Sequence, residues 1–351
     1  MGWSPEEFTR EMAILQVFAN YKYDEYKNFS PGMRFIESLA LWLRQFEVED
    51  RKIAYSFFKE KLVFISIEEM EHFVAITYPD IIRPLLMKKM ANNLQIPEYN
   101  VKKIATSVHF SLYQRQCLFL GLSDGAHIDF FRRCNLELSH EQIYQTYEIS
   151  DKRSEKMLAE LNKSLNSESK RFQSVILLDD FSGSGRSYVR WDDKETKFVG
   201  KISTFFEFLF NEAQKDNPLF DFSDFHVYIV LYVATNQAKL YLNEMMNKLI
   251  GGRKINFSIH IVHFLRDSFK IKIDENKEFV RLMKSKFNPN IVDDHFLKGA
   301  HQQAFLGFDE CALPLILSHN TPNNSLPILW YEEKNKNHGL FPRVSRHGDR
   351  I

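Results

Sequence analysis

The sequence predicts an α/β protein, with a mostly parallel sheet flanked by helices and a separate α-helical domain at the N-terminus. From about residue 112, short apolar runs alternate with helical patterns, as expected for strands buried on both faces of a parallel sheet. The residues before them show only the helical spacing of apolar side chains. At 351 residues the chain is long enough for two domains, and we expect them at 1–105 and 106–351, with a helical insertion at about 139–171.

The first hundred residues are expected to form helices. One apolar stretch covers residues 35–46 and is opened by Ser30-Pro31, a capping residue followed by a proline. A second begins at Ile65 and ends before Pro79, and a third covers residues 81–94. Helices of this length fit either a winged-helix-like unit or a helical cap packed on the next domain, and the sequence leaves both open.

The rest of the chain is expected to supply the sheet and its covering helices. The apolar runs predict strands at 117–122, 174–178, 226–233, 255–263 and 313–317, and helices at 202–213, 237–249 and 276–283. The segment 151–171 is charged and rich in Ser and Asn. We interpret it as an exposed helix and loop inserted between the first two strands.

Composition and charge exclude several classes of protein. The chain is 44% hydrophobic and 26% charged, which excludes disordered and coiled-coil proteins. Its 46 Lys and Arg residues balance 46 Asp and Glu residues, so a globally basic nucleic-acid binder is disfavoured, although a local basic patch is not. No apolar run reaches the ~18 residues of a membrane helix, and the acidic start lacks the apolar core of a signal peptide. Three cysteines without a Cys-x-x-Cys pair suit a reducing cytoplasm.

One segment carries most of the chemical information. A buried strand, 175–178, ends in the acids Asp179 and Asp180 and leads into a loop of small residues. The candidate ligand-binding residues of that loop are Ser182, Gly183, Ser184, Gly185, Arg186 and Ser187. Ligands bind at the carboxyl ends of parallel strands. Glycines let the backbone approach a ligand closely, and successive N–H groups with serine hydroxyls form a cradle for a phosphate, to which the arginine would add charge.

Two adjacent carboxylates at a strand end are costly unless something satisfies them. Ribose hydroxyls or a hydrated Mg²⁺ ion, held through Asp179 and Asp180, are suitable partners. The order of apolar strand, acids and loop favours a nucleotide-phosphate site over a solvated Asp-Asp turn beside a flexible loop. Neither the Walker A nor the Rossmann pattern fits, because no Gly-Lys-Ser/Thr closes the loop and the acids precede it.

A second candidate lies one strand earlier. The apolar run 118–122 enters a tight turn, Ser123-Asp124-Gly125, which is followed by His127 and a short helix. This turn is either an ordinary structural turn or a second ligand-binding loop beside the first. The histidine is correspondingly either a phosphate or base contact or a side chain that is satisfied at the start of a helix.

A third polar segment lies near the C-terminus. Residues 318–325 are dense in amide donors and acceptors, and an aromatic residue, Trp330, follows them. Asn320 and Asn323 are candidates for covering the base or the acceptor, with the indole ring available for stacking. The alternative is an ordinary surface turn made of Asn and Pro.

The Asp-Asp segment resembles the PRPP-binding motif of type I phosphoribosyltransferases: four apolar residues, two acids, two variable residues and a short Thr/Ser/Gly loop. It matches without gaps. The resemblance implies a type I phosphoribosyltransferase-like fold, with Asp179 and Asp180 on the ribose 2′ and 3′ hydroxyls and residues 182–187 around the 5′-phosphate. It also implies Mg²⁺ as the cofactor and PRPP or a nucleotide as the ligand.

The other two segments make the resemblance more specific. The turn at 123–125 stands, in chain order, where those enzymes carry their pyrophosphate loop. Together with residues 318–330 and 339–343, it resembles phosphoribosyltransferase-like domains of bacterial anti-phage loci, some of them beside retron reverse transcriptases. The resemblance covers about two-thirds of the chain. It implies a protein, RNA or DNA partner in a defence complex, such as a reverse transcriptase.

One departure from the pattern concerns the first loop. Biosynthetic members place a basic or glycine-rich loop against pyrophosphate, whereas this chain has Asp124 there. A carboxylate beside a diphosphate is repulsive by roughly a few kcal/mol in a partly dry site. Either Mg²⁺ bridges the two and Asp124 helps to hold it, or the leaving group is not pyrophosphate and Asp124 acts as a base or nucleophile at the anomeric carbon.

The leading hypothesis is therefore a cytoplasmic anti-phage effector that transfers or hydrolyses a phosphoribosyl group, by glycosyl transfer or N-glycosidic hydrolysis. The alternative is a non-catalytic subunit of a defence complex that senses a nucleotide or binds nucleic acid or a partner protein. That alternative predicts a shared basic surface formed by Arg83, Lys88, Lys89, Lys102 and Lys103.

Overall fold

A computed structural model describes residues 1–292, 294–299, 302–333 and 336–343. By its spatial contacts the chain divides into two compact units. The first joins Met1–Glu69 to Arg266–Ile351, and the second is Met70–Leu265. The boundary expected after residue 105 was based on the change from a helical to a strand-and-helix pattern in the sequence. The division into units is based instead on which residues lie close together in space. Each unit is described by itself below.

The second unit is built on one parallel sheet of five strands. In sheet order they are β3 (Ile143–Tyr144), β2 (Cys117–Gly121), β4 (Ser174–Ser182), β7 (His226–Thr235) and β8 (Asn256–Leu265). Numbered by their order in the chain, the strands run 2-1-3-4-5 across the sheet. The predicted α/β class with a parallel sheet flanked by helices is confirmed.

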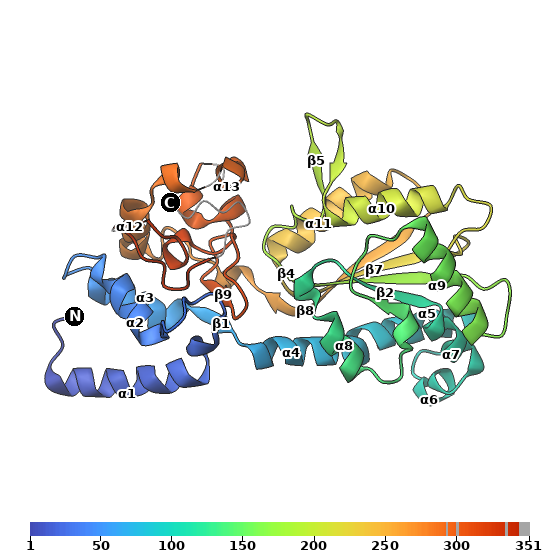
Figure 1. Ribbon diagram of the computed structural model, residues 1–351, viewed down its shortest axis with the longest axis horizontal. Helices are drawn as coiled ribbons and strands as arrows, with labels where there is room; N and C mark the ends of the chain where they lie inside the picture. Colours follow the sequence, from blue (N-terminus) through green and yellow to red (C-terminus); the bar gives the residue numbers. More distant parts are fainter. Residues whose placement is uncertain (293, 300–301, 334–335, 344–351) are drawn as a thin grey trace. The chain divides into compact units, whose positions relative to one another are not determined.

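Helices cover both faces of this sheet (Figure 1). One face packs on α9 (Asp151–Ser164), α10 (Lys201–Glu212) and α11 (Asn236–Ile250). The other lies toward α5 (Arg83–Leu94), α6 (Val101–Ala105), α7 (Val108–Arg115) and α8 (Ile128–Cys134). The central strands are apolar throughout because both faces are covered: Val175 and Ile176, which point to opposite faces, are both fully buried.

Most of the predicted elements of this unit are present. The four predicted strands within it are found, and β4 continues four residues beyond its expected end, through the two acids to Ser182. The helices expected at 202–213 and 237–249 are α10 and α11. The antiparallel pair β5 (Arg190–Asp192) and β6 (Lys197–Val199), which the sequence pattern does not predict, separates β4 from α10.

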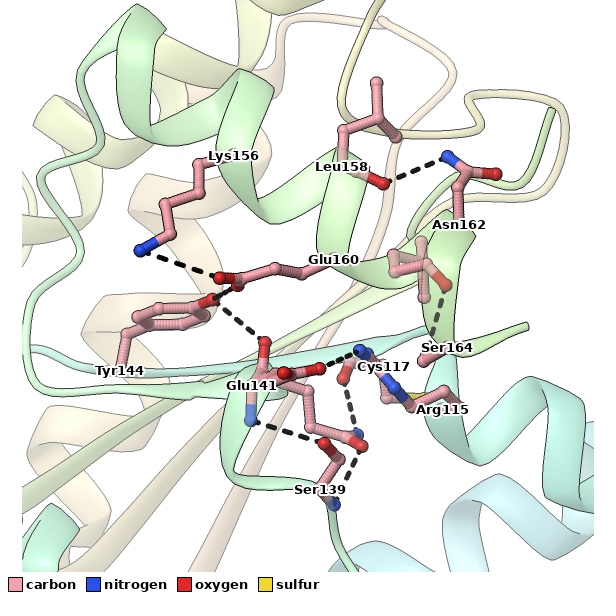
Figure 2. Close-up of polar contacts among 12 residues, drawn as sticks. Arg115, Cys117, Ser139, Glu141, Tyr144, Lys156, Leu158, Glu160, Asn162 and Ser164 are labelled. Carbon is pink, nitrogen blue, oxygen red and sulfur yellow. Dashed lines mark hydrogen bonds and ion pairs between the residues drawn. The ribbon is translucent and has the colours of Figure 1, made fainter. Parts of the chain in front are cut away.

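The segment expected as an insertion supplies parts of the fold itself. It contains edge strand β3, and α9 packs on the sheet through Met157 and Leu161, both nearly fully buried. Figure 2 shows polar contacts that join the two: the Tyr144 hydroxyl donates to Glu160 of α9 at 3.3 Å and to the Glu141 carbonyl at 2.9 Å. The two-residue strand, which pairs with β2 through its backbone, is thus also tied to α9 by a side-chain bond.

The helix expected to stop before Pro79 continues in another form. The α-helix α4 (Ile67–Ile76) does end there, but a π-helical turn, Thr77–Ile82, carries the path on to α5. Proline lacks the N–H that an α-helix needs at this point, and the wider turn accommodates its ring without ending the helical path.

The first unit has an aromatic core and a two-stranded parallel pair. Strand β1 (Val63–Ile65) pairs with β9 (Leu315–Leu317). Its helices are α1 (Pro5–Tyr21), α2 (Phe35–Arg44), α3 (Arg51–Lys61), α12 (Lys277–Lys286) and α13 (Asp294–Gly299). Phe341 is fully buried and stacks on Phe35, which brings C-terminal residues into the core of the N-terminal helices.

Two expectations for this unit are wrong. The run at 313–317 pairs with β1 and is not a strand of the large sheet. The helix expected to open at Ser30-Pro31 begins at Phe35, after Arg34, because residues 31–32 form a turn whose Gly32 has a φ of +85°. A winged-helix-like arrangement of the N-terminal helices stays a prediction. No helix within the described residues is long and apolar enough to cross a membrane.

Candidate functional site

The strand order predicts a ligand-binding position at one point of the sheet. In a 2-1-3-4-5 sheet the order reverses between the first and third strands, here β2 and β4, and ligands bind beyond their carboxyl ends. The register pairs Gly121 with Leu178, so Asp179 and Asp180 follow directly where β2 ends. The turn after β2 and the acids of β4 therefore meet at the switch point.

Asp179 is the most constrained residue of this cluster. Its side chain is 0% exposed. Its Oδ1 accepts a hydrogen bond from the Ser123 hydroxyl and another, at 3.1 Å, from the Asp180 N–H, and its Oδ2 accepts one from the Lys201 ammonium at 2.7 Å. Burial raises the pKa of Asp179 and the neighbouring Asp180 charge raises it further, while Lys201 opposes both. Both carboxylate oxygens are thus engaged within the protein.

Asp180 is only half-buried and is held differently. Its Oδ1 accepts the Phe181 N–H at 2.7 Å. The other oxygen lies against Gly125 of the preceding turn, so closely that a Cβ at Gly125 would overlap the carboxylate. The turn must therefore carry glycine at this position for the Asp180 side chain to keep its place.

The serine-glycine loop is folded tightly onto the end of β4 and the start of α11. Residues 182–185 are buried. The Ser182 hydroxyl accepts the Gly185 N–H at 3.1 Å, and the Thr235 hydroxyl donates to the Gly183 carbonyl at 2.6 Å. Gly185 has a φ of +81°, and a Cβ there would meet Tyr241 at 2.9 Å. Glycine is required at this bend.

The rim of the loop is more accessible than its interior. Ser187 is exposed, and Arg186 is half-buried with its guanidinium 5.1 Å from the centroid of the Tyr241 ring. The buried loop thus presents its C-terminal residues outward. Of the six loop residues predicted to bind a phosphate, these are the two that are at least partly exposed.

The Ser123-Asp124-Gly125 turn is anchored from β7. The Tyr232 hydroxyl donates to the carbonyl of Ala126 at 2.7 Å. Asp124 is exposed, and its neighbour Ser123 is half-buried and bonded to Asp179. His127 is half-buried and has a φ of +47°, a left-handed conformation at the start of α8. The turn is therefore fixed on both sides while the Asp124 carboxylate faces solvent.

The structure brings some of the predicted residues together directly. Ser123 contacts Asp179, and Gly125 contacts Asp180. Asn320 and Asn323 belong to the first unit: the Asn28 amide donates to Asn320 Oδ1 at 2.9 Å, and the Asn323 carbonyl accepts the Phe308 N–H at 2.8 Å. Their role in ligand binding stays a prediction.

The sequence reasoning missed Lys201. It stands at the first position of α10, after Gly200, whose φ of +121° and close approach to the Tyr188 carbonyl leave no room for a side chain. No spacing rule links this lysine to an acid 22 residues earlier. A lysine after glycine at a helix start is the only local signal, and it is a weak one.

Two of the three carboxylates at the predicted site are suitable ligands for Mg²⁺. Among the described residues, no group of three or more His, Cys, Asp or Glu side chains is arranged to hold a metal ion. Mg²⁺ commonly uses only one or two carboxylates with water and substrate phosphates. Asp180 and the exposed Asp124 suit that role. Asp179 does not, because an ammonium already holds one of its oxygens.

Comparison with known proteins gives one finding. The PRTase-CE family model matches residues 39–343, which include all the strands described above. No curated protein and no solved structure matches the chain.

Proposed function

The chain belongs to the PRTase-CE family, the phosphoribosyltransferases of conflict and effector systems, and we propose that it binds PRPP or a nucleotide and acts on the phosphoribosyl group as an anti-phage effector. One observation carries this proposal. The Ser-Asp-Gly turn and the Asp-Asp strand end meet at the switch point through the contact of Ser123 with Asp179. A site of two loops at that point suits a ligand with a sugar between two phosphate groups.

In this proposal the half-buried Asp180 accepts a hydrogen bond from the ribose diol. The 5′-phosphate binds at the outward end of the serine-glycine loop, where Arg186 and Ser187 are accessible. Anchoring the sugar at both points orients C1 for attack. The acids then stabilise the positive charge that develops on the sugar ring.

Asp124 is assigned the leaving-group side of the site. It is exposed, precedes the glycine that contacts Asp180, and so stands beside the sugar. Mg²⁺, when bound with a diphosphate, would supply charge neutralisation of the leaving group. If the ligand is instead a nucleotide, the Asp124 carboxylate takes a proton from the attacking water or acceptor, and the base leaves from C1.

The test is a turnover assay on the full chain. PRPP and several nucleotides, each with Mg²⁺, are incubated with the protein, and release of pyrophosphate or free base is measured. We expect product from at least one ligand, and a loss of at least about 100-fold in kcat/KM for Asp124→Asn, as for removal of a general base or metal ligand. Turnover that survives in Asp124→Asn overturns this role.

The nucleic-acid-binding alternative has weaker support. Of the five basic side chains expected on one surface, Lys88 lies 3.6 Å from Glu98 and Lys89 lies 3.1 Å from Asp224. Arg83 lies over the Phe110 ring. These contacts reduce the positive potential available to a phosphate backbone. Nucleic-acid binding that weakens steeply with salt would restore the alternative.

A further inference from the structure

A shallow groove with a rim of cations lies along α12 in the first unit. Its volume is about 500 Å³, which is in the range of small-ligand sites. The floor is aliphatic, because Val280 is buried and Ile273 is half-buried. Three exposed cations lie on the same helix face as Val280, since the four positions are three or four residues apart. The groove is lined by Ile273, Lys277, Val280, Arg281, Lys284 and Ser285.

Two of the three cations have no acidic partner among the described residues. Arg281 pairs with Asp50, but no ion pair within that part of the chain involves Lys277 or Lys284. The Lys284 ammonium lies 5.1 Å from the centroid of the Phe305 ring. A ring of this kind attracts the ammonium without neutralising its charge. The groove therefore keeps a positive charge that the protein itself does not balance.

This arrangement costs the helix some stability. Like charges three or four positions apart on a helix repel one another, and the acid that pairs with Arg281 relieves only the middle cation. Asp274 and Glu278 are exposed acids of the same segment, and neither forms an ion pair with Lys277 or Lys284 within the described ranges. An anion bound over the two lysines would remove the remaining repulsion.

The positions of the charges favour a ligand with several phosphate groups. Lys277 and Lys284 are seven residues apart, or roughly 10 Å along the helix axis. A lysine ammonium is a compact point charge that binds phosphate well. The exposed Ser285 hydroxyl is a further donor at the rim. The aliphatic floor beside these groups suits the flat, largely apolar face of a base.

We propose that this groove is a nucleotide site separate from the one at the switch point. Lys277 and Lys284 bind phosphate groups, Ser285 donates to a phosphate oxygen, and Ile273 and Val280 contact the base. The phosphate chemistry is the same for a free nucleotide and for one within a single strand, and the experiment distinguishes the two. The site belongs to the first unit and does not rest on the proposed function.

The experiment is a calorimetric titration of the full chain with ATP at low ionic strength. Lys277→Met/Lys284→Met should lose one ATP-binding event or weaken it at least about tenfold, because both charges that meet the phosphates are removed. Its Tm should stay within about 2 °C of the wild type, because both side chains are exposed. Lys272→Met is the matched control: this lysine is exposed, pairs with Glu275 at 2.6 Å and does not line the groove.

Three further probes make the result specific. ATP should bind at least about threefold more tightly than inorganic tripolyphosphate, because only ATP has a base for the aliphatic floor; equal affinities would overturn the role of the floor. A single-stranded oligonucleotide that binds the wild type more tightly than ATP does, and loses that binding in the double variant, would identify a strand as the source of the nucleotide. Polyglutamate should bind more weakly than either.

The proposal is overturned if ATP and the oligonucleotide bind the double variant as they bind the wild type, or if neither binds the wild type. Polyglutamate that binds as tightly as the nucleotide probes, with the same loss in the double variant, would identify an acidic protein segment as the ligand and overturn the nucleotide assignment. A chain that turns over neither PRPP nor nucleotides contradicts the proposed function and leaves these outcomes unchanged.

Discussion

Two polar loops of this molecule look alike in the sequence and differ in the structure. The loop at 182–187 and the loop at 318–325 are both rich in small polar residues. In the second, neutral groups satisfy one another: the Tyr26 hydroxyl lies 2.8 Å from Thr321 Oγ1, and the Thr321 hydroxyl donates to the Phe341 carbonyl at 3.1 Å. The first follows a fully buried carboxylate in β4, Asp179, whose charge is compensated by a lysine from another element, Lys201.

The difference shows that a loop rich in polar residues is not for that reason a functional site. Neutral hydrogen bonds formed within one unit fold a loop at modest cost. A buried charge is expensive, and a protein keeps one mainly where it orders a site or takes part in chemistry. This comparison favours the proposed site at the switch point of the second unit over the loop at 318–325.

The largest effect is expected from filling the space between the two loops of the switch point. A Cβ at Gly125 overlaps the Asp180 carboxylate, so Gly125→Val should displace that acid and weaken PRPP binding by about 100-fold or more. Titration calorimetry measures it. The control is Gly252→Ala in the same unit, which introduces backbone strain at a φ of +79° but places no atom within 4 Å of the added Cβ, so that it separates strain from displacement of Asp180. Equal affinities for the Gly125 variant and the wild type would show that Asp180 is not the ligand contact.

A smaller effect is expected in the first unit, on stability alone. Tyr26→Phe removes a buried hydroxyl that contacts Thr321 and donates to the Pro342 carbonyl at 2.8 Å. The free energy of unfolding should fall by about 1–3 kcal/mol, because buried acceptors lose their partner. Chemical denaturation measures it, with Tyr21→Phe, 85% exposed, as the control. PRPP affinity should be unchanged, and a loss of affinity would link this loop to the site.

The smallest effect is expected from Asn320→Ala. Its side chain accepts the Asn28 amide at the partly buried edge of the loop, so we expect a loss of stability of about 0.5–1.5 kcal/mol and PRPP affinity within about twofold of the wild type. The same titration checks it. A tenfold loss of affinity, in Asn320→Ala or in Asn323→Ala, would instead support the predicted role of these amides in covering the ligand.

Part of the fold was predictable because the pattern of apolar residues along the sequence reflects which residues are buried. Runs such as 175–178 and 227–231 are apolar in every position, and only a sheet covered on both faces buries them. The run at 313–317 has the same character but pairs with Val63–Ile65, more than two hundred residues earlier. Local pattern predicts that a strand exists and carries no information on its partner.

The site was predictable to the extent that its residues are adjacent in the chain. Asp179, Asp180 and the loop after them form one continuous motif, and the glycine at 125 follows its own strand closely. Lys201 comes to Asp179 through the hairpin β5–β6 and the start of α10, a path set by tertiary packing. The unequal burial of the two acids is likewise a property of the packed sheet and has no signature in an Asp-Asp pair.

The most direct measurement is a titration of the full chain with PRPP and Mg²⁺, run on the wild type, on Asp180→Asn and on Asp193→Asn, an exposed acid of the hairpin. We expect saturable binding to the wild type and to Asp193→Asn, and affinity lower by at least about tenfold for Asp180→Asn. Binding that is equal in all three proteins would contradict the claim that a phosphoribosyl group docks where β2 and β4 end.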